Sequence, residues 1–248
     1  MPARPQTPSA KSRPFAVFDI DGTLIRWQLY HSMADKLARM GFMDAKNHQR
    51  IKDARMVWKR RAGDFSDYEK VLIEGFDQTV VKLSMPQLET AVEAVFEEYK
   101  EQAYTFTRDL ISTLKNQGYL LFAVSGSPVQ IVSKVAGFYG FDAFAASEYE
   151  YHNEKFTGQK KVIAREKRQA LEPLVKKFNA SSKNSLGVGD TSSDIPMLEM
   201  VDRPIAFNPD KRLFAHAKSR GWEIILERKD MVYKLRRGRG SYELAETG

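Results

Sequence analysis

Apolar and polar positions along this chain follow two different periods. Short apolar runs bounded by polar or glycine-containing turns are typical of buried strands, whereas apolar residues spaced three or four apart predict helices. The predicted strands are Phe15–Ile20, Tyr119–Ser125, Ser185–Val188, Pro204–Phe207 and Trp222–Leu226. The helices predicted between them are Thr107–Asn116, Pro128–Tyr139, Val162–Phe178 and Ile195–Met200. Alternation of strands and helices predicts an α/β fold.

The long segment between the first two predicted strands contains no strand-like run. Its apolar residues follow helical spacing, as in Leu88, Val92, Val95 and Tyr99. We therefore expect a helical cap over residues 27–103, inserted into an α/β core formed by residues 15–26 and 104–227. Phe141–Gly158 is predicted as a short β-hairpin. The whole fold is then a Rossmann-like, mostly parallel sheet with helices on both faces, plus the inserted cap.

The composition is that of a globular protein, but the charge is concentrated at the ends. Of 248 residues, 42% are hydrophobic and 29% charged, and the net charge is +7. Residues 1–14 hold three basic and no acidic residues, and residues 228–248 hold six basic against three acidic residues. We interpret the first segment as a disordered tail and the second as a basic tail. Short basic runs are usually solvated, so we expect no contact of these tails with nucleic acid or anionic lipid.

Several functional classes are excluded or disfavoured by the residues that are missing. The chain has no cysteine, which excludes disulfides and thiolate metal sites. The four histidines are scattered without the spacing of a zinc site. No apolar stretch is long enough to span a bilayer, and the proline-rich start does not resemble a secretory or transit signal. We therefore expect a cytoplasmic protein.

Three predicted strands end in polar clusters, namely Asp19–Thr23, Ser125–Ser127 and Gly189–Asp194. The carboxyl ends of parallel strands meet at one edge of a sheet, where ligands bind. Asp19 and Asp21 are two positions apart and would share a face of a regular strand. Because neighbouring carboxylates repel each other, folding gives no reason for this pair, whereas binding a divalent cation does.

Four motifs in order resemble the haloacid dehalogenase superfamily, in particular its phosphoserine-phosphatase-like branch with a helical cap after the first motif. The motifs are Asp19-Ile20-Asp21-Gly22-Thr23, Val124-Ser125-Gly126-Ser127, Lys167 and Gly189-Asp190-Thr191-Ser192-Ser193-Asp194. The resemblance extends from Phe15 to about Leu226. Lys167 precedes Asp190 at the distance seen in this branch, although Lys160, Lys161, Arg165 and Arg168 lie nearby.

The resemblance implies a phosphatase that works through an aspartyl-phosphate intermediate. Asp19 would attack phosphorus, which divides one difficult hydrolysis into two easier steps. Asp21 would protonate the departing alkoxide and then accept a proton from water. Ser125 and Lys167 would complete the catalytic set by binding the oxygens of the transferred group.

The resemblance also implies Mg²⁺ and a small phosphorylated metabolite as substrate. The metal ligands would be Asp19, the backbone carbonyl of Asp21 and Asp190, with Asp194 binding directly or orienting a metal-bound water. Gly126 and Ser193 would bind the phosphate. Gln28 stands where phosphoserine phosphatases carry a glutamate for the substrate ammonium, which argues against phosphoserine as the substrate.

Other interpretations stay open at this point. A phosphomutase or phosphotransferase of the same superfamily keeps both aspartates, whereas dehalogenases lack the second one. A different class is an RNA- or membrane-binding module that uses the basic tails. Trp27, Tyr30 and His31 follow the first motif, and we expect them in the core of the cap, with substrate contact as the alternative.

Overall fold

A computed structural model describes residues 12–238 and 241–247 of the chain. Its strands form one sheet in the order β4-β3-β2-β1-β5-β6-β7-β8-β9. The run β3-β2-β1-β5-β6-β7 pairs in parallel, whereas β4 pairs antiparallel with β3, β8 with β7 and β9 with β8. The strands are β1 (Pro14–Phe18), β2 (Leu120–Pro128), β3 (Ala143–His152), β4 (Lys155–Lys161), β5 (Ser181–Gly189), β6 (Arg203–Phe207), β7 (Glu223–Arg228), β8 (Met231–Arg237) and β9 (Tyr242–Thr247).

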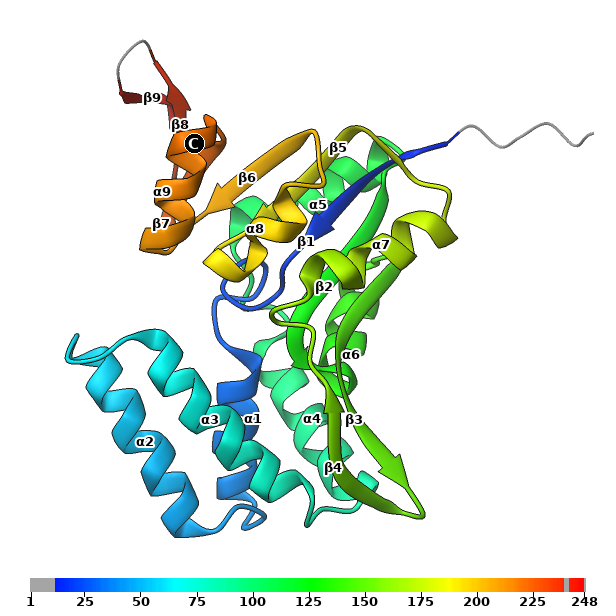
Figure 1. Cartoon of the computed structure of the whole chain (residues 1–248), viewed down its shortest axis with the longest axis vertical. Helices are drawn as coiled ribbons and strands as arrows, with labels where there is room; N and C mark the ends of the chain where they lie inside the picture. Colours follow the sequence, from blue (N-terminus) through cyan, green and yellow to red (C-terminus); the bar gives the residue numbers. More distant parts are fainter. Residues whose placement is uncertain (1–11, 239–240, 248) are drawn as a thin grey trace, which may run out of the picture.

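Helices cover both faces of this sheet (Figure 1). One face packs against α5 (Thr105–Asn116) and α6 (Val129–Tyr139), and the other against α7 (Lys167–Lys177), α8 (Ile195–Leu198) and α9 (Lys211–Arg220). Successive residues of a strand point to opposite faces, so Ala16 and Phe18 of β1 join the first layer whereas Phe15 and Val17 join the second. The predicted α/β fold with a mostly parallel sheet is confirmed.

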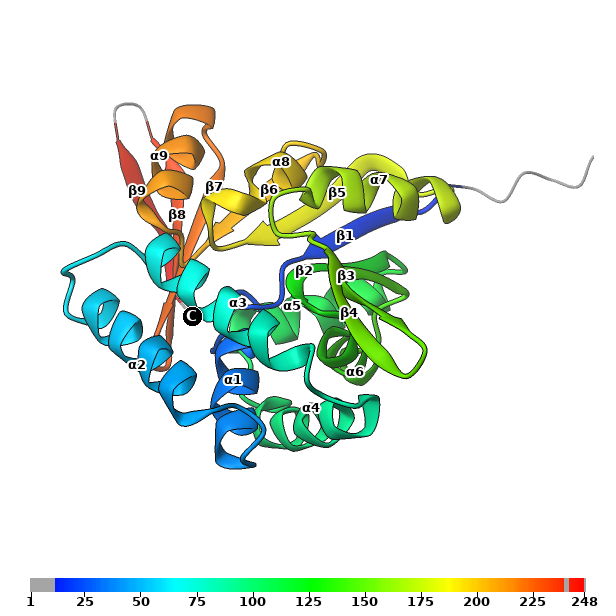
Figure 2. The ribbon, with the colours of Figure 1, turned by 60° about the horizontal axis from the view of Figure 1, so that its bottom comes forward.

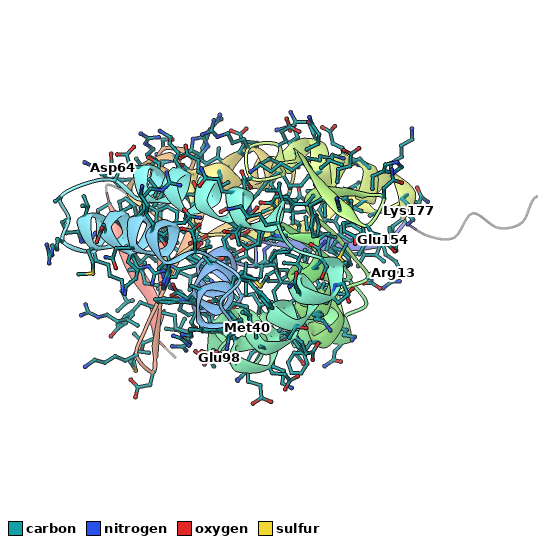
Figure 3. The ribbon with its side chains drawn as sticks, turned by 90° about the horizontal axis from the view of Figure 1, so that it is seen from below. Arg13, Met40, Asp64, Glu98, Glu154 and Lys177 are labelled. Atoms are coloured by element: carbon teal, nitrogen blue, oxygen red, sulfur yellow. The ribbon has the colours of Figure 1, made fainter. Side chains whose placement is uncertain are left out.

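Of the five helices between β1 and β2, the first four lie together to one side of the sheet (Figure 2). They are α1 (Leu29–Arg39), α2 (Ala45–Lys59), α3 (Phe65–Val80) and α4 (Met85–Tyr99). Lys36 of α1 donates to Glu98 of α4 over 2.8 Å, close to where Met40 and Glu98 are labelled in Figure 3. We refer to these helices as the cap.

The cap also contacts the β3–β4 hairpin. Asp77 of α3 accepts a hydrogen bond of 2.7 Å from the Tyr149 hydroxyl of β3 and pairs with Lys160 of β4 at 2.5 Å. The hydroxyls of Tyr149 and Tyr30 lie 2.9 Å apart, which extends the network to α1. The hairpin therefore binds the cap from the β4 side of the sheet.

The two chain connections between core and cap are bound to each other. Ile25 and Ala103 form an antiparallel bridge, and the backbone N–H of Arg26 donates to the carbonyl of Gln102 over 2.9 Å. Arg26 also pairs with Glu227 of β7. Glu227, which is buried, accepts from the first backbone N–H groups of α5 at distances of 3.2 and 2.9 Å. One carboxylate thus binds both the connection between core and cap, at Arg26, and the start of α5.

Replacing this carboxylate should destabilise the protein. We expect Glu227→Ala to lower the free energy of unfolding by about 2 kcal/mol, because two N–H groups of α5 and Arg26 lose a charged acceptor. Urea unfolding measures the change, and Glu223→Ala on the same strand is the matched control. Equal unfolding midpoints for the two variants would contradict the role given to Glu227.

The carboxyl-terminal segment differs from its prediction as a tail. Strand β8 pairs with β7, and β9 pairs with β8, so the described part of residues 228–248 extends the sheet. Val232 packs against one face of the core, and Leu235 and Tyr242 against the other. The basic residues of β8 lie among these apolar positions and obscure their pattern in the sequence.

Two further predictions change at their boundaries. Of the tail predicted over residues 1–14, residues 1–11 lie outside the described residues, whereas Arg13 donates to the carbonyls of Gly118 and Tyr119 and β1 begins at Pro14. The helix predicted to start at Val162 begins at Lys167. Before it, β4 ends the hairpin at Lys161 with polar residues that lack the alternation that predicts a strand, and residues 162–166 connect β4 to α7.

Within the described residues, no helix combines the length and apolar character needed to cross a bilayer.

Candidate active site

A buried lysine lies between two carboxylates at the carboxyl edge of the sheet. Lys167, the first residue of α7, donates to Asp19 at 2.6 Å and to Asp194 at 2.5 Å. Asp19 directly follows β1, and Asp194 ends the short 3₁₀ turn Ser192–Asp194 after β5. Burial alone would lower the pKa of Lys167, but the two carboxylates outweigh it and raise that pKa, so the ammonium stays charged.

One of the two oxygens of Asp19 accepts no hydrogen bond from Lys167. Its Oδ1 accepts from Lys167, whereas its Oδ2 lies 3.4 Å from the Thr23 hydroxyl. Burial raises the pKa of Asp19 to about 7, with Lys167 opposing this rise and Asp194 and Asp21 adding to it. A cation bound beside Asp19 would favour its ionised form, which is the form that can act as a nucleophile.

Three carboxylates form a group that fits a divalent cation. Oxygens of Asp19, Asp190 and Asp194 all lie within 4.8 Å of one another. With one lysine among three carboxylates, two negative charges remain for a hard cation such as Mg²⁺, which prefers oxygen ligands. Burial raises the pKa of Asp190 well above its ordinary value, with Asp19 and Asp194 contributing. A bound cation would reduce the repulsion among these three carboxylates and favour their ionised forms.

Asp194 has both oxygens engaged within the protein. Its Oδ1 accepts from Lys167, and its Oδ2 accepts from the backbone N–H groups of Asp190 and Thr191 at 3.1 and 2.9 Å. This arrangement favours an indirect role, in which Asp194 orients its neighbours or a metal-bound water. Gly22 leaves room for Asp190, since a Cβ there would lie 2.3 Å from an Asp190 oxygen.

Asp21 lies outside the carboxylate group and has its own hydrogen-bond donors. The backbone N–H of Leu29, at the start of α1, donates to Asp21 Oδ1 over 2.6 Å. The hydroxyls of Ser125 and Ser127 donate to Asp21 Oδ2 over 2.8 and 2.9 Å. Burial raises the pKa of Asp21, although these hydrogen bonds oppose the rise. A carboxyl group of this kind is suited to exchanging a proton.

The end of β2 after Ser125 is fixed on both sides. Gly126 packs so closely against Ala164 that a Cβ would lie 2.8 Å from the Ala164 Cβ. The Gly126 carbonyl accepts from the buried hydroxyl of Ser147 over 2.7 Å, and Ser127 N–H donates to Ser125 Oγ over 2.9 Å. Both groups of the peptide between Gly126 and Ser127 are therefore held in place.

Most of the residues predicted for the site meet at this edge of the sheet, but two lie at its margin. Asp19, Asp21, Ser125, Gly126, Lys167, Asp190 and Asp194 are brought together. Gln28, just before α1, has its Nε2 3.4 Å from where a Gly22 Cβ would lie. The Ser193 hydroxyl lies 2.8 Å from that of Thr191 and is thus engaged within its own turn. Arg168, which lies near Lys167 in the sequence, has its guanidinium 3.7 Å from the carboxylate of Glu199.

Residues that sequence reasoning missed are Ser127, Ser147, Thr23 and Glu69. Glu69 of α3 is half-buried, and burial raises its pKa, with Arg165 and Lys167 opposing and Asp21 adding to the rise. Asp21 and Lys167 are therefore close enough to this cap residue to change its pKa. Ser127 and Thr23 belong to the motifs quoted above and could have been singled out; Ser147 and Glu69 carry no local signal.

His31 lies in the core of the cap. Its Nδ1 is 2.8 Å from the Tyr68 hydroxyl, and its ring centroid is 5.0 Å from that of Trp27. Burial lowers the pKa of His31 to about 4, with Arg55 contributing and Asp35 opposing. His31 is thus neutral at neutral pH and belongs to the packing of α1 against α3.

This buried histidine predicts a loss of stability in acid. The pKa of an ordinary histidine, about 6.5, is higher than the pKa of His31 in the folded protein. The unfolded chain therefore binds more protons than the folded protein between about pH 6.5 and pH 4. The free energy of unfolding should therefore fall as the pH decreases through this window, by on the order of 2 kcal/mol at about pH 5. Urea unfolding at neutral and acidic pH measures it. His31→Gln should weaken the dependence, and the surface variant His152→Gln should keep it; the same slope in both would contradict the assignment.

Known proteins match this chain in sequence. A family model described as haloacid dehalogenase-like hydrolase matches residues 16–199. An "inhibition of morphological differentiation protein" of Streptomyces azureus is 25% identical over 222 residues, or 86% of this chain and 78% of that protein. A phosphoserine phosphatase of Archaeoglobus fulgidus is 26% identical over 209 residues, or 83% of this chain and 55% of that protein. The chain thus spans only about half the length of the second relative.

Solved structures match it in fold. A Bordetella pertussis protein of unknown function superposes with a TM-score of 0.71 at 23% identity, covering 86% of this chain and 98% of that one. A phosphoserine phosphatase solved as an analogue of its phospho-aspartyl intermediate has a TM-score of 0.63 at 22% identity, covering 89% and 96%. At these identities the likeness concerns the fold alone.

Proposed function

Since this chain belongs to the haloacid dehalogenase-like hydrolases, we propose that it is a Mg²⁺-dependent phosphatase of a small phosphate monoester, with Asp19 as the phosphorylated residue. The observation that carries the proposal is the separation of two kinds of carboxylate at one site. Asp19 shares Lys167 with Asp194, in a group that fits a cation. Asp21 stands apart, with donors of its own.

The reaction divides into two displacements at phosphorus. In the first, an Asp19 oxygen forms a bond to phosphorus as the ester oxygen leaves and takes a proton from Asp21. In the second, water gives a proton to Asp21 and attacks phosphorus, which releases inorganic phosphate and restores the Asp19 carboxylate. Lys167, the Gly126 amide and the Ser125 hydroxyl bind the phosphoryl oxygens, on which the transition state concentrates charge.

Asp19 and Asp190, with the backbone carbonyl of Asp21, are the residues proposed to hold Mg²⁺, and Asp194 supports them. When bound, the cation supplies positive charge between the nucleophile and the anionic phosphate. Removing it with EDTA should abolish phosphate release, and adding Mg²⁺ back should restore it.

The substrate is proposed to be a small monoester other than phosphoserine. Relatives named phosphoserine phosphatases support a small substrate. Gln28, however, offers hydrogen bonds without the full charge that a glutamate gives to an ammonium group. Gln28 is therefore suited to a substrate whose alcohol carries neutral hydrogen-bonding groups rather than an ammonium group.

A screen of phosphate monoesters tests both levels of this proposal. Release of inorganic phosphate from an aryl phosphate and from a series of small alkyl phosphates is measured with Mg²⁺ and with EDTA. Mg²⁺-dependent release is expected. Conversion of a sugar phosphate into its isomer without release would instead indicate a phosphomutase, and a large preference for phosphoserine would contradict the substrate proposal alone.

A further inference from the structure

The hydroxyl of Ser125 is already engaged before any substrate is considered. It donates its proton to Asp21 Oδ2 over 2.8 Å and accepts from the N–H of Ser127 over 2.9 Å. A serine hydroxyl has a single proton to donate. Ser125 therefore cannot donate to a phosphoryl oxygen while it keeps its hydrogen bond to Asp21, although the proposed reaction uses Ser125 as a phosphate donor.

Ser127 offers a second donor to the same oxygen of Asp21. Its hydroxyl lies 2.9 Å from Asp21 Oδ2, and its side chain is buried, with 2% of the residue exposed. The backbone at Ser127 is held by its N–H bond to Ser125 and by the following Pro128, which restricts the preceding residue to extended conformations. The Ser127 hydroxyl can therefore keep its hydrogen bond to Asp21 when the Ser125 hydroxyl gives up its own.

We propose that Ser127 is a positioning residue, which holds the Asp21 side chain while the Ser125 hydroxyl turns from Asp21 to the phosphate. The inference rests on the proposed phosphatase function. With substrate bound, Asp21 would keep two donors, the Leu29 N–H on Oδ1 and the Ser127 hydroxyl on Oδ2. Without Ser127, only the Leu29 contact would remain, and the carboxyl could rotate away from the leaving oxygen.

The inference predicts an effect that depends on the leaving group. An alkyl phosphate releases a poor leaving group that needs the proton of Asp21, whereas an activated aryl phosphate needs it little. General acid catalysis contributes roughly 10²–10⁴-fold to such steps, so we expect Ser127→Ala to lower kcat roughly 10- to 100-fold on an alkyl phosphate. On the aryl phosphate we expect the first step, seen as phenol release in the first turnover, to change by less than about threefold, whereas the second step slows because Asp21 also accepts the proton of water.

The experiment measures the rate of alcohol or phenol release in the first turnover, together with kcat, for both esters with the full-length wild type, Ser127→Ala and Ser133→Ala, a matched serine variant on α6. Ser133→Ala should behave as wild type, and melting curves show that each variant is folded. If Ser127→Ala does not fold, Ser127→Cys gives the same comparison, because a thiol is close in size and a weaker donor.

The outcomes separate the two levels of the argument. An equal loss of the first-turnover rate on both esters, or no loss on either, would overturn the positioning role of Ser127 while leaving a phosphatase. A wild type that releases no phosphate from either ester would instead overturn the proposed function. A first-turnover rate that falls on the alkyl phosphate and hardly changes on the aryl phosphate is the result expected.

Discussion

Asp19→Asn is expected to lose at least about a thousandfold in phosphate release, because an amide cannot replace the carboxylate as a nucleophile. Asparagine keeps the size of the side chain, and Lys167 keeps its hydrogen bond to Asp194. The variant should therefore fold. Release of phosphate from an aryl ester at saturating Mg²⁺ measures the effect, and Asp109→Asn, an exposed acidic residue on α5, is the control.

A second measurement asks where the phosphoryl group goes. Wild-type protein that is mixed with substrate and denatured rapidly in acid should retain one covalently bound phosphoryl group on the peptide that contains Asp19. The asparagine variant should retain none. Full activity of Asp19→Asn, or a phosphorylated peptide elsewhere in the chain, would contradict the proposed nucleophile.

Lys167→Gln should have the largest effect on stability. The substitution removes the cation that the buried Asp19 and Asp194 share, and removing one partner of a buried ion pair typically costs 3–5 kcal/mol. We expect a loss of about 3 kcal/mol in the free energy of unfolding without metal, together with the loss of measurable turnover. Urea unfolding in EDTA measures the first and phosphate release the second.

The metal should partly compensate for this loss. A cluster that has lost its lysine is more negative, so added Mg²⁺ should stabilise Lys167→Gln more than it stabilises the wild type. Lys176→Gln, an exposed lysine near the end of α7, controls for loss of charge on the helix. Unchanged midpoints for Lys167→Gln would show that the carboxylates do not depend on this lysine.

The core of the site was predictable because its signals are local. A buried strand that ends in Asp19 and Asp21 predicts an unusual pair of carboxylates, and parallel topology predicts that Ser125 and Asp190 lie near them. The structure brings these residues together as expected. The sequence pattern does not indicate which hydroxyl or carboxylate each side chain contacts; Ser147, for example, donates to the Gly126 carbonyl from β3.

The two edges of the fold were harder to predict than its centre. In β8 the basic residues dominate a strand that is only partly buried, and the segment resembles a solvated end. In β4 only Phe156 is buried, so the period of two that identifies a strand is missing. Both strands are stabilised by pairing with a neighbour, and such pairing depends on residues that are distant in the sequence.

The contacts of the cap with the sheet have a consequence for how substrate preference can change. Glu227 of β7 binds Arg26 in the connection between core and cap, and Tyr149 of β3 and Lys160 of β4 bind Asp77 of the cap. The orientation of the cap is thus set from strands on both sides of β1, from β3 and β4 on one side and from β7 on the other. Substitutions in strands that never touch the substrate can therefore retune which alcohols fit, while the residues that act on phosphorus stay as they are.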